Sequence, residues 1–195
     1  MTKFGMSPPV PWLGQGKIRS RAFVIYEDMH ARIVKAKHGP EMLVRPLRNG
    51  DTATVQAVFD RLSEESRRTR FNGLKNRLGE QELRWLATVG PKHHVLVGYV
   101  DGDPEPVAIA RLVRSGASAE VAFEVADAYH GRGIGSALTQ ELVADACAAG
   151  IVEVTALVRS DNPAAFAILQ RALGQVQVRY EGPEMVVRAP LPAVC

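Results

Sequence analysis

The amino-acid sequence predicts a mixed α/β domain with a central sheet of about seven strands flanked by about four helices. Apolar runs of strand length alternate with apolar residues at helical spacing from Met42 onward. Short turns join several successive strand-like runs, which predicts antiparallel pairs. A helix-length segment separates two other runs, which predicts a right-handed crossover and a parallel pair.

Composition supports a globular domain and narrows its ligands. The 195 residues are 46% hydrophobic and 23% charged, which is enough for a sizeable core. Lys and Arg number 24 against 21 Asp and Glu, a net charge of +3 that is spread along the chain. Such mild basicity suits an anionic ligand better than nucleic acid. We find no run of ~18 apolar residues and no signal-type segment, so we expect a cytoplasmic protein with no membrane partner.

The chain divides at residue 42. Residues 1–41 are expected to form a partly flexible N-terminal extension, and residues 42–195 the folded domain. Within the extension, residues 21–26 favour a short strand and residues 28–37 a helical turn. The extension can serve as a solvated arm, an added edge strand for dimerisation, or a lid over the site.

The first half of the domain reads as one strand, two helices and three strands. Residues 42–47 form the first strand, and Asp51 caps a helix with apolar residues at helical spacing. A polar stretch, residues 63–70, precedes a second helix that starts near residue 79. Three strands then follow at residues 93–100, 107–113 and 119–126, joined by turns.

The second half begins with a glycine loop and ends with a hairpin. A helix is expected over residues 134–149, because Ile134, Leu138 and Leu142 lie four apart on one face. A strand at residues 152–158 comes next. Asp161 or Asn162 then caps another helix that ends at Gly174. Residues 175–180 and 185–189 close the sheet as a hairpin.

The glycine loop carries the strongest chemical signal. Gly131, Gly133 and Gly135 alternate with Arg132 and Ile134 immediately before a helix. Missing Cβ atoms let a backbone approach a phosphate closely. The first N–H groups of a helix lack intrahelical partners and lie at its positive end. The pattern therefore predicts a pyrophosphate site, to which Arg132 adds charge and Ser136 a hydroxyl.

Three other interpretations of the loop are weaker. The dinucleotide motif G-x-G-x-x-G requires glycine where Ser136 stands, and its acidic partner should end the next strand, whereas Glu153 begins it. The P-loop motif requires Gly-Lys-Ser/Thr, which is absent. A glycine turn without a ligand remains the structural alternative. Cys147 and Cys195 lack metal-ligand spacing, and we expect no metal.

The residues around this loop resemble the signature of the GNAT superfamily of N-acetyltransferases. The resemblance is carried by the strand 119–126, the following residues 127–129, and the segment 131–138. The element order from residue 42 to about 191 is similar too. Residues 61–71 resemble the opening of the catalytic domain in bacterial protein-lysine acetyltransferases. The resemblance implies a GNAT fold whose splayed central strands form an acetyl-CoA slot.

The resemblance also implies which residues bind the donor. Backbone groups from Phe123 to Val125 would contact the pantetheine arm, and Asn162 would lie near it. The pyrophosphate would lie on the loop, whose implied ligands are His130, Gly131, Arg132, Gly133, Ile134, Gly135 and Ser136.

Two positions depart from the family pattern. His130 stands where Gln or Arg is usual, and its charge would depend on pH. Many relatives have a tyrosine as general acid where this chain has Leu169 or Gln170. Tyr129 and Tyr180 are the nearest tyrosines, and packing roles suit both. Water can protonate the thiolate instead.

Glu120 and Glu124 are the candidate general bases. An acceptor lysine with a reference pKa of ~10.4 must lose a proton before it attacks a thioester. The two glutamates lie four apart in a strand and so share a face, with Ala122 between them. Glu120 matches the catalytic glutamate of similar lysine acetyltransferases and is the first choice.

The sequence therefore predicts an acetyl-CoA-dependent N-acetyltransferase with a protein lysine as preferred acceptor. A small amine such as a polyamine, amino acid or aminoglycoside is the alternative acceptor. A non-catalytic module that senses acetyl-CoA is the alternative from another class, since the usual tyrosine is missing. We expect a monomer or homodimer.

Overall fold

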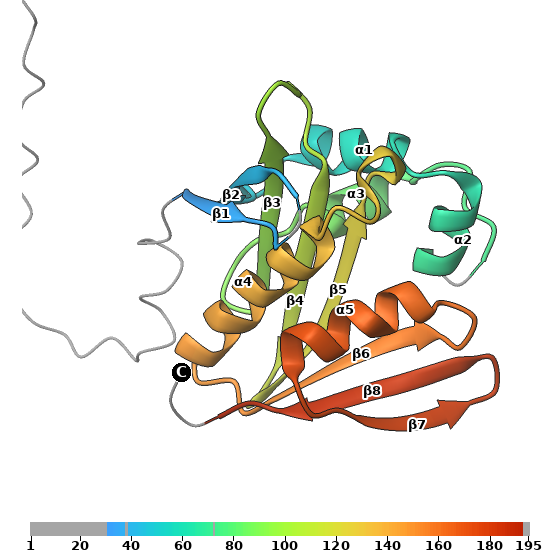
Figure 1. Ribbon diagram of the computed structural model, residues 1–195. Helices are drawn as coiled ribbons and strands as arrows, with labels where there is room; N and C mark the ends of the chain where they lie inside the picture. The colour runs from blue at the N-terminus through green and yellow to red at the C-terminus, as the bar shows by residue number, and fades with distance from the viewer. Residues whose placement is uncertain (1–30, 38, 72, 193–195) are drawn as a thin grey trace, which may run out of the picture.

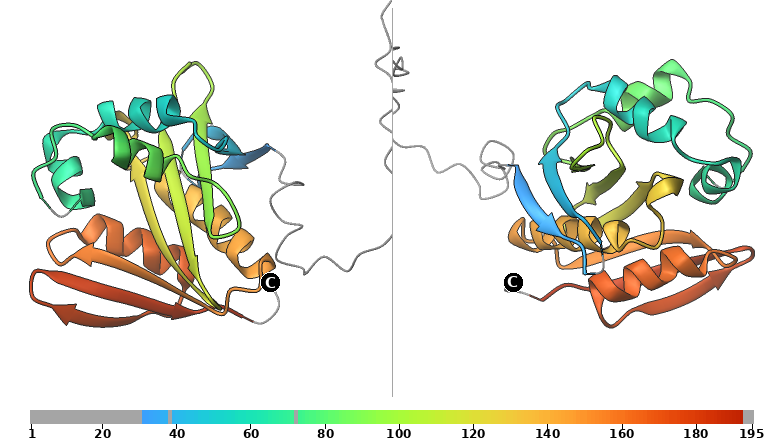
Figure 2. Two further views of the ribbon diagram at one scale, coloured as in Figure 1. Left: turned by 180° about the vertical axis from the view of Figure 1, so that it is seen from behind. Right: turned by 45° about the horizontal axis from the view of Figure 1, so that its top comes forward.

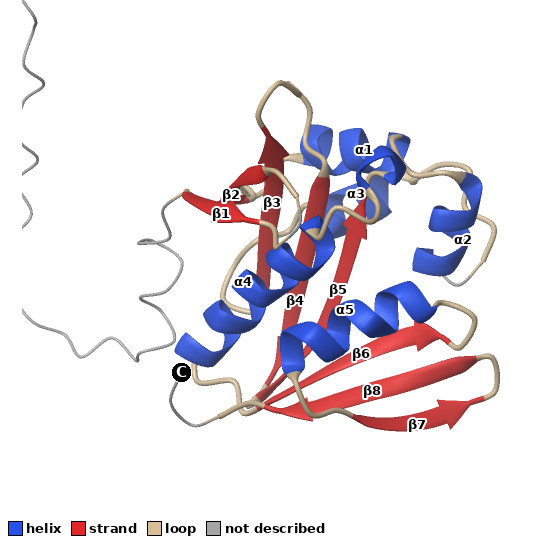
Figure 3. Ribbon diagram, in the orientation of Figure 1, coloured by secondary structure: helices blue, strands red, loops and turns tan. Residues whose placement is uncertain are grey.

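The computed structural model describes residues 31–37, 39–71 and 73–192. They form a mixed sheet with helices on both faces (Figures 1 and 3). The strands are β1 Arg32–Lys35, β2 Glu41–Pro46, β3 His93–Val100, β4 Ala108–Ser115, β5 Ser118–Val125, β6 Glu153–Arg159, β7 Gln177–Glu181 and β8 Glu184–Pro190. The helices are α1 Thr52–Asp60, α2 Glu64–Phe71, α3 Glu80–Leu86, α4 Ile134–Ala148 and α5 Pro163–Leu173, with a short 3-10 helix at Asp127–Tyr129.

The sheet separates at its centre. Its strand order is β1-β2-β3-β4-β5-β6-β8-β7, and every neighbouring pair is antiparallel except β5 and β6. These two parallel strands pair only from Ser118 to Glu120 on β5, and Figure 1 shows them diverging beyond that point. The edge of β5 that faces β6 is therefore open over residues 121–125. The splayed slot implied by the GNAT resemblance is confirmed.

Two apolar clusters cover opposite faces of the sheet. α4 and α5 pack on one face, where Ile134, Leu138 and Leu169 are fully buried. α1 and α3 pack on the other face through Val58, Phe59 and their neighbours. Figure 2 shows this arrangement from behind and with the top of the molecule tilted forward. The alternation of β5 places Val121 and Phe123 toward α4, and Glu120, Ala122 and Glu124 toward the face of α1 and α3.

The predicted mixed sheet is confirmed, with one strand and one helix more than expected. The extra helix is α2, in a segment whose charged sequence has no apolar period. The extra strand is β1, which pairs antiparallel with β2. The helical turn expected over residues 28–37 is wrong, because Arg32–Lys35 is extended in this hairpin. The strand expected at residues 21–26 lies outside the described residues.

Candidate active site

A pocket of about 610 Å³ lies where β5 and β6 separate. Its walls come from the open edge of β5, the glycine loop, the facing part of β6, α5, and helix α2. Sequence-predicted residues in its lining are Phe123, Glu124, Val125, His130, Gly131, Gly133, Ile134, Gly135, Ser136 and Asn162. Two predicted residues, Glu120 and Arg132, are not part of the lining.

The glycine loop has the geometry of an anion site. Gly131 and Gly133 have φ values of 72° and 76°, which residues with a Cβ rarely adopt. Gly133 is the N-cap of α4 and has no side chain to cap the helix. The first helical bond runs from the Ala137 N–H to the Gly133 carbonyl at 3.0 Å. The preceding N–H groups of α4 therefore lack intrahelical partners, beside the pocket.

Close packing behind the loop also favours a small residue at Gly135. A Cβ on Gly135 would lie 2.9 Å from Cδ1 of Ile168 and 3.2 Å from Cγ2 of Val125. The start of α4 is thus held directly against α5 and the end of β5. This contact fixes the helix N-terminus at the open end of the slot.

Tyr129 is a support for the loop and is already hydrogen bonded. Its hydroxyl donates to Asp103 at 2.7 Å, and Arg61 forms an ion pair with the same carboxylate. Arg61 and Tyr129 together hold the pKa of Asp103 well below its usual range, and the same hydrogen bond raises the pKa of Tyr129. Arg132 stacks over the Tyr129 ring at 5.0 Å, which accounts for its position outside the lining.

His130 and Asn162 make defined hydrogen bonds beside the pocket. His130 Nε2 lies 2.8 Å from the Val125 carbonyl. Because a carbonyl only accepts, this nitrogen must carry the proton. The side-chain oxygen of Asn162 accepts from the Ala165 N–H at 3.0 Å and caps α5. Both residues therefore shape the site through the backbone of β5 and α5.

The two candidate bases have different surroundings. Glu124 is buried, lines the pocket and accepts a hydrogen bond from Nε of Arg70 at 2.8 Å. Glu120 lies on the same face of β5 but is exposed and outside the pocket lining. Only Glu124 therefore combines burial with access to the slot.

A buried arginine lies behind Glu124. Arg111 on β4 is directly opposite Ala122 and is only 5% exposed. Its Nη1 donates to the Leu86 carbonyl at 2.8 Å, and its Nη2 has no hydrogen-bond partner among the described residues. Burial lowers its pKa to about 10, and the nearby charge of Glu124 opposes that shift. Arg111 therefore remains charged at neutral pH. A charged residue inside an apolar strand is the sequence signal that could have revealed it.

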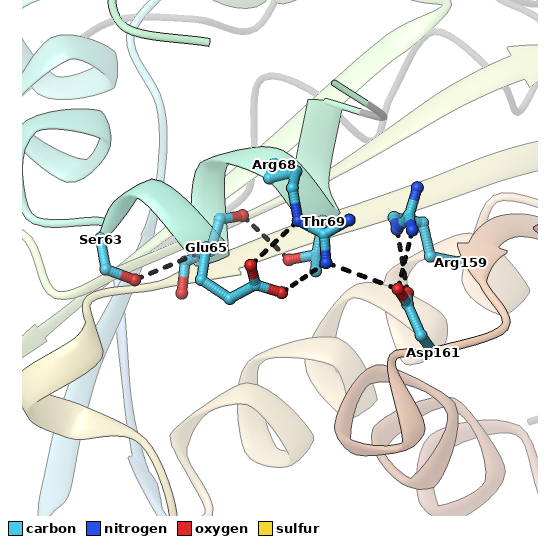
Figure 4. A network of polar contacts seen from close by, with 7 residues as sticks. Ser63, Glu65, Arg68, Thr69, Arg159 and Asp161 are labelled. Carbon is cyan, nitrogen blue, oxygen red and sulfur yellow. Dashed lines mark hydrogen bonds and ion pairs between the residues drawn. The ribbon is translucent and has the colours of Figure 1, made fainter. Parts of the chain in front are cut away.

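Helix α2 forms a wall of the pocket that the sequence analysis missed. Its lining residues are Glu65, Ser66, Thr69 and Arg70. Figure 4 shows how Arg68 connects this helix to the segment between β6 and α5. Arg68 donates to Glu65 at 2.7 Å and lies 3.4 Å from Asp161.

Asp161 is itself held by an arginine of β6. Arg159 contacts its carboxylate at 2.7 Å. Mainly because of Arg159, and despite some desolvation, the pKa of Asp161 is lowered to about 2. The carboxylate therefore stays charged near neutral pH and joins the two sides of the pocket mouth.

Within residues 31–37, 39–71 and 73–192, no cluster of three or more His, Cys, Asp or Glu side chains could hold a metal ion. No helix in those ranges has the length and apolar character needed to cross a membrane.

The fold and the pocket define a protein of the N-acetyltransferase class, and comparison with known proteins agrees. Residues 55–175 match the acetyltransferase (GNAT) family. The chain therefore belongs to this family, whose members use acetyl-CoA. The family prediction made from the glycine loop is confirmed.

Individual relatives show which members of the family this chain resembles. The chain is 33% identical to "Acetyltransferase Pat" of Mycolicibacterium smegmatis over 83% of its own length, and spans about half (49%) of that relative. Its fold resembles the GNAT domain of S. lividans PAT, with a TM-score of 0.72, 24% identity, and coverage of 90% and 100% of the two chains. It also resembles a cAMP-binding acyltransferase from Mycobacterium smegmatis, with a TM-score of 0.59, 27% identity, and coverage of 89% and 50%.

Proposed function

We propose that this chain transfers the acetyl group of acetyl-CoA to a primary amine, and that the acceptor is a protein lysine. One observation carries the proposal: a single pocket runs from an uncapped helix N-terminus, along an open strand edge, to a buried carboxylate. The first feature suits a pyrophosphate, the second a pantetheine arm, and the third a proton acceptor.

The donor site would be built mainly from backbone groups. Gly131, Gly133 and the first turn of α4 would hold the pyrophosphate, with Ser136 adding a hydroxyl. Phe123 and Val125 lie on the open edge of β5, where an extended pantetheine can hydrogen bond as an added strand does. Acetyl-CoA would supply an activated acyl carbonyl at the far end of this arm.

Glu124 is the base that the geometry supports best. Among the described residues, Arg70 is its one hydrogen-bond partner and contacts a single carboxylate oxygen. The other oxygen remains to accept a proton from the amine, directly or through water. Arg70 and Arg111 supply positive charge beside this carboxylate. Glu120 matches the family pattern, but its exposure and position outside the pocket favour Glu124.

Water is the proposed proton donor to the departing thiolate. The described tyrosines are Tyr99, Tyr129 and Tyr180. Tyr99 and Tyr129 are hydrogen bonded to Arg45 and Asp103, and Tyr180 is exposed outside the pocket lining. Leu169, at one of the positions where relatives have a tyrosine, is apolar and buried.

Two features favour a protein lysine over a small amine. Residues 61–71 resemble the corresponding segment of bacterial protein-lysine acetyltransferases, and the structure places this segment at the pocket as α2. The similarity to the acetyltransferase Pat agrees with this choice. An unpaired acidic patch around the mouth would favour a polycation, but Glu65 and Asp161 are each paired with arginine.

Glu124→Gln tests the mechanism. We expect at least ~100-fold lower turnover on a lysine peptide, because the amide cannot accept the proton. Acetyl-CoA affinity, measured by calorimetry, should change less than about twofold. Glu120→Gln is the matched control on the same strand face and should keep most of its turnover.

The opposite result for this pair of variants would assign the role of general base to Glu120.

Mass spectrometry of a cell lysate incubated with labelled acetyl-CoA and the protein tests the identity of the acceptor. We expect label on protein lysines. Label confined to small amines would support the alternative acceptor. Donor binding without any acetylated product would support a sensing module.

A further inference from the structure

The turn between β1 and β2 presses against the pyrophosphate loop. The described residues of this turn are Ala36, Lys37, Gly39 and Pro40, and Gly39 lies directly on the backbone of Arg132. A Cβ at Gly39 would be 1.9 Å from the Arg132 carbonyl oxygen and 3.0 Å from its carbonyl carbon. Real Cβ contacts are essentially never closer than 3.0 Å. The φ of Gly39 lies outside the positive range, so its backbone conformation does not require glycine. Glycine is needed here because any side chain would collide with the Arg132 backbone.

Hydrogen bonds within the turn and ion pairs to α4 hold the turn in place against the glycine loop, and we call this support the brace. Gly39 donates to the Ala36 carbonyl at 3.2 Å, and Ala36 donates to the Pro40 carbonyl at 3.3 Å. Ala36 is fully buried. Arg32 at the other end of β1 forms ion pairs with Glu141 and Asp145 of α4. The hairpin is thus tied to the same helix whose N-terminus lies at the pyrophosphate loop (Figure 1).

The contact constrains the direction of a backbone N–H. The peptide between Arg132 and Gly133 is planar and trans, because no cis peptide occurs among the described residues. Its carbonyl oxygen faces Gly39, so the Gly133 N–H points away from the turn. Gly133 lines the pocket. Moving the oxygen by about an ångström would rotate this N–H relative to a bound anion.

We propose that the β1–β2 turn is a positioning element of the donor site, in which Gly39 fixes the peptide that presents the Gly133 N–H to the pyrophosphate. This inference rests on the proposed function, because it assigns the loop to acetyl-CoA. It adds a residue from before the matched family region, residues 55–175, to the machinery of donor binding.

Gly39→Ala tests the brace. The added methyl must displace the Arg132 carbonyl, so we expect the Kd for acetyl-CoA to rise about tenfold, roughly 1.4 kcal/mol. The KM for the acceptor should change less than twofold, because the acceptor is proposed to approach Glu124 and not this loop. Calorimetry measures the Kd, and steady-state kinetics separates the two KM values. A merely structural defect would lower the folded fraction and leave both constants unchanged.

Gly90→Ala is the matched control. Gly90 also lacks a positive φ, and a Cβ there would meet nothing within 4 Å. This variant should bind acetyl-CoA as the parent does. Arg32→Gln is a second, independent variant, which loosens the hairpin from α4 without adding a clash. We expect about a threefold higher Kd for acetyl-CoA and an unchanged acceptor KM.

Unchanged Kd values overturn the inference. If Gly39→Ala does not fold, the Arg32→Gln result decides alone. Acetyl-CoA binding by the parent protein distinguishes failure of the proposed function from failure of the role given to Gly39. If the parent does not bind acetyl-CoA, the proposed function fails. If it binds and the variants bind equally well, only the brace is wrong.

Discussion

Asp103 shows how a single residue supports the donor loop from another part of the chain. It lies in the turn between β3 and β4 and accepts hydrogen bonds from Arg61 and from Tyr129, 26 residues later. Tyr129 in turn packs beside Arg132 and lines the pocket. The carboxylate therefore links the turn to the short 3-10 helix that precedes the glycine loop.

This arrangement predicts a pH-dependent contribution to stability. The folded-state pKa of Asp103 is lowered mainly by Arg61, so the unfolded chain takes up a proton first as pH falls. The stabilisation is complete above the unfolded pKa of about 3.9 and is lost as pH falls toward the folded value. Asp103→Asn should lower the Tm by a few degrees at pH 7. That difference should shrink as the pH falls below about 4.

Thermal unfolding monitored by circular dichroism measures both effects. Asp101→Asn is the control, because Asp101 is an exposed carboxylate in the same turn. Its Tm should match the parent at every pH. A gap for Asp103→Asn that stays constant down to pH 3 would show that the carboxylate charge is not responsible.

Residue-level reasoning from sequence placed both glutamates of β5 on one face, and only the family resemblance made Glu120 the first choice as base. The period of two fixes the face and carries no information on depth. The side chain that contacts the buried Glu124 belongs to Arg70, which is 54 residues away in the chain. The backbone ligands of the loop were easier to predict, because glycine spacing and a helix start are local features.

At the scale of elements, α2 is held mainly by polar contacts. It has no buried residue, and its sequence is largely charged. Arg70 ties it to β5, and the Arg68–Asp161 ion pair ties it to the start of α5 (Figure 4). A helix stabilised in this way has no apolar period, which is why the sequence pattern gave only a polar stretch. The strand β1 was missed similarly, because its four residues depend on pairing with β2.

Arg68→Ala should loosen α2 without unfolding the domain. Exposed ion pairs contribute little to global stability, so the global Tm should fall by no more than about 2 °C. Amide hydrogen exchange in α2 should accelerate by up to about fivefold, because the helix opens locally. Arg84→Ala is the control, since Arg84 forms an exposed pair with Glu80 within α3. It should leave exchange in α2 unchanged. Equal exchange in both variants would show that Arg68 does not hold the helix.

At the scale of the whole molecule, the pocket lies along a seam in the sheet. Strands β1 to β5 form one part and β6, β8 and β7 the other, and only three residue pairs join β5 to β6. Apart from α2, the order of elements was predictable from residue 42 onward because periodicity and turns are local. The seam was not, since no residue pattern in either strand marks where pairing stops. It was expected only through the family resemblance.

Binding of acetyl-CoA in this seam should raise the free energy of unfolding of the whole domain. A donor that binds both the loop and the open edge of β5 binds the native state alone, so it shifts unfolding by mass action. At about 100 times its Kd, acetyl-CoA should add about 2.7 kcal/mol and raise the Tm by roughly 5–10 °C. Glu124→Gln should show the same rise, because the carboxylate is assigned to proton transfer.

NAD at the same concentration discriminates between the two interpretations of the glycine loop. It has a pyrophosphate and an adenosine but no pantetheine arm, so it can satisfy the loop without filling the slot along β5. Differential scanning fluorimetry should therefore show a rise with NAD that is much smaller than with acetyl-CoA. Equal rises would mean that the loop alone determines binding and that the open strand edge contributes nothing. A larger rise with NAD would contradict the donor assignment itself, and with it the proposal that the seam in the sheet is the acetyl-CoA slot.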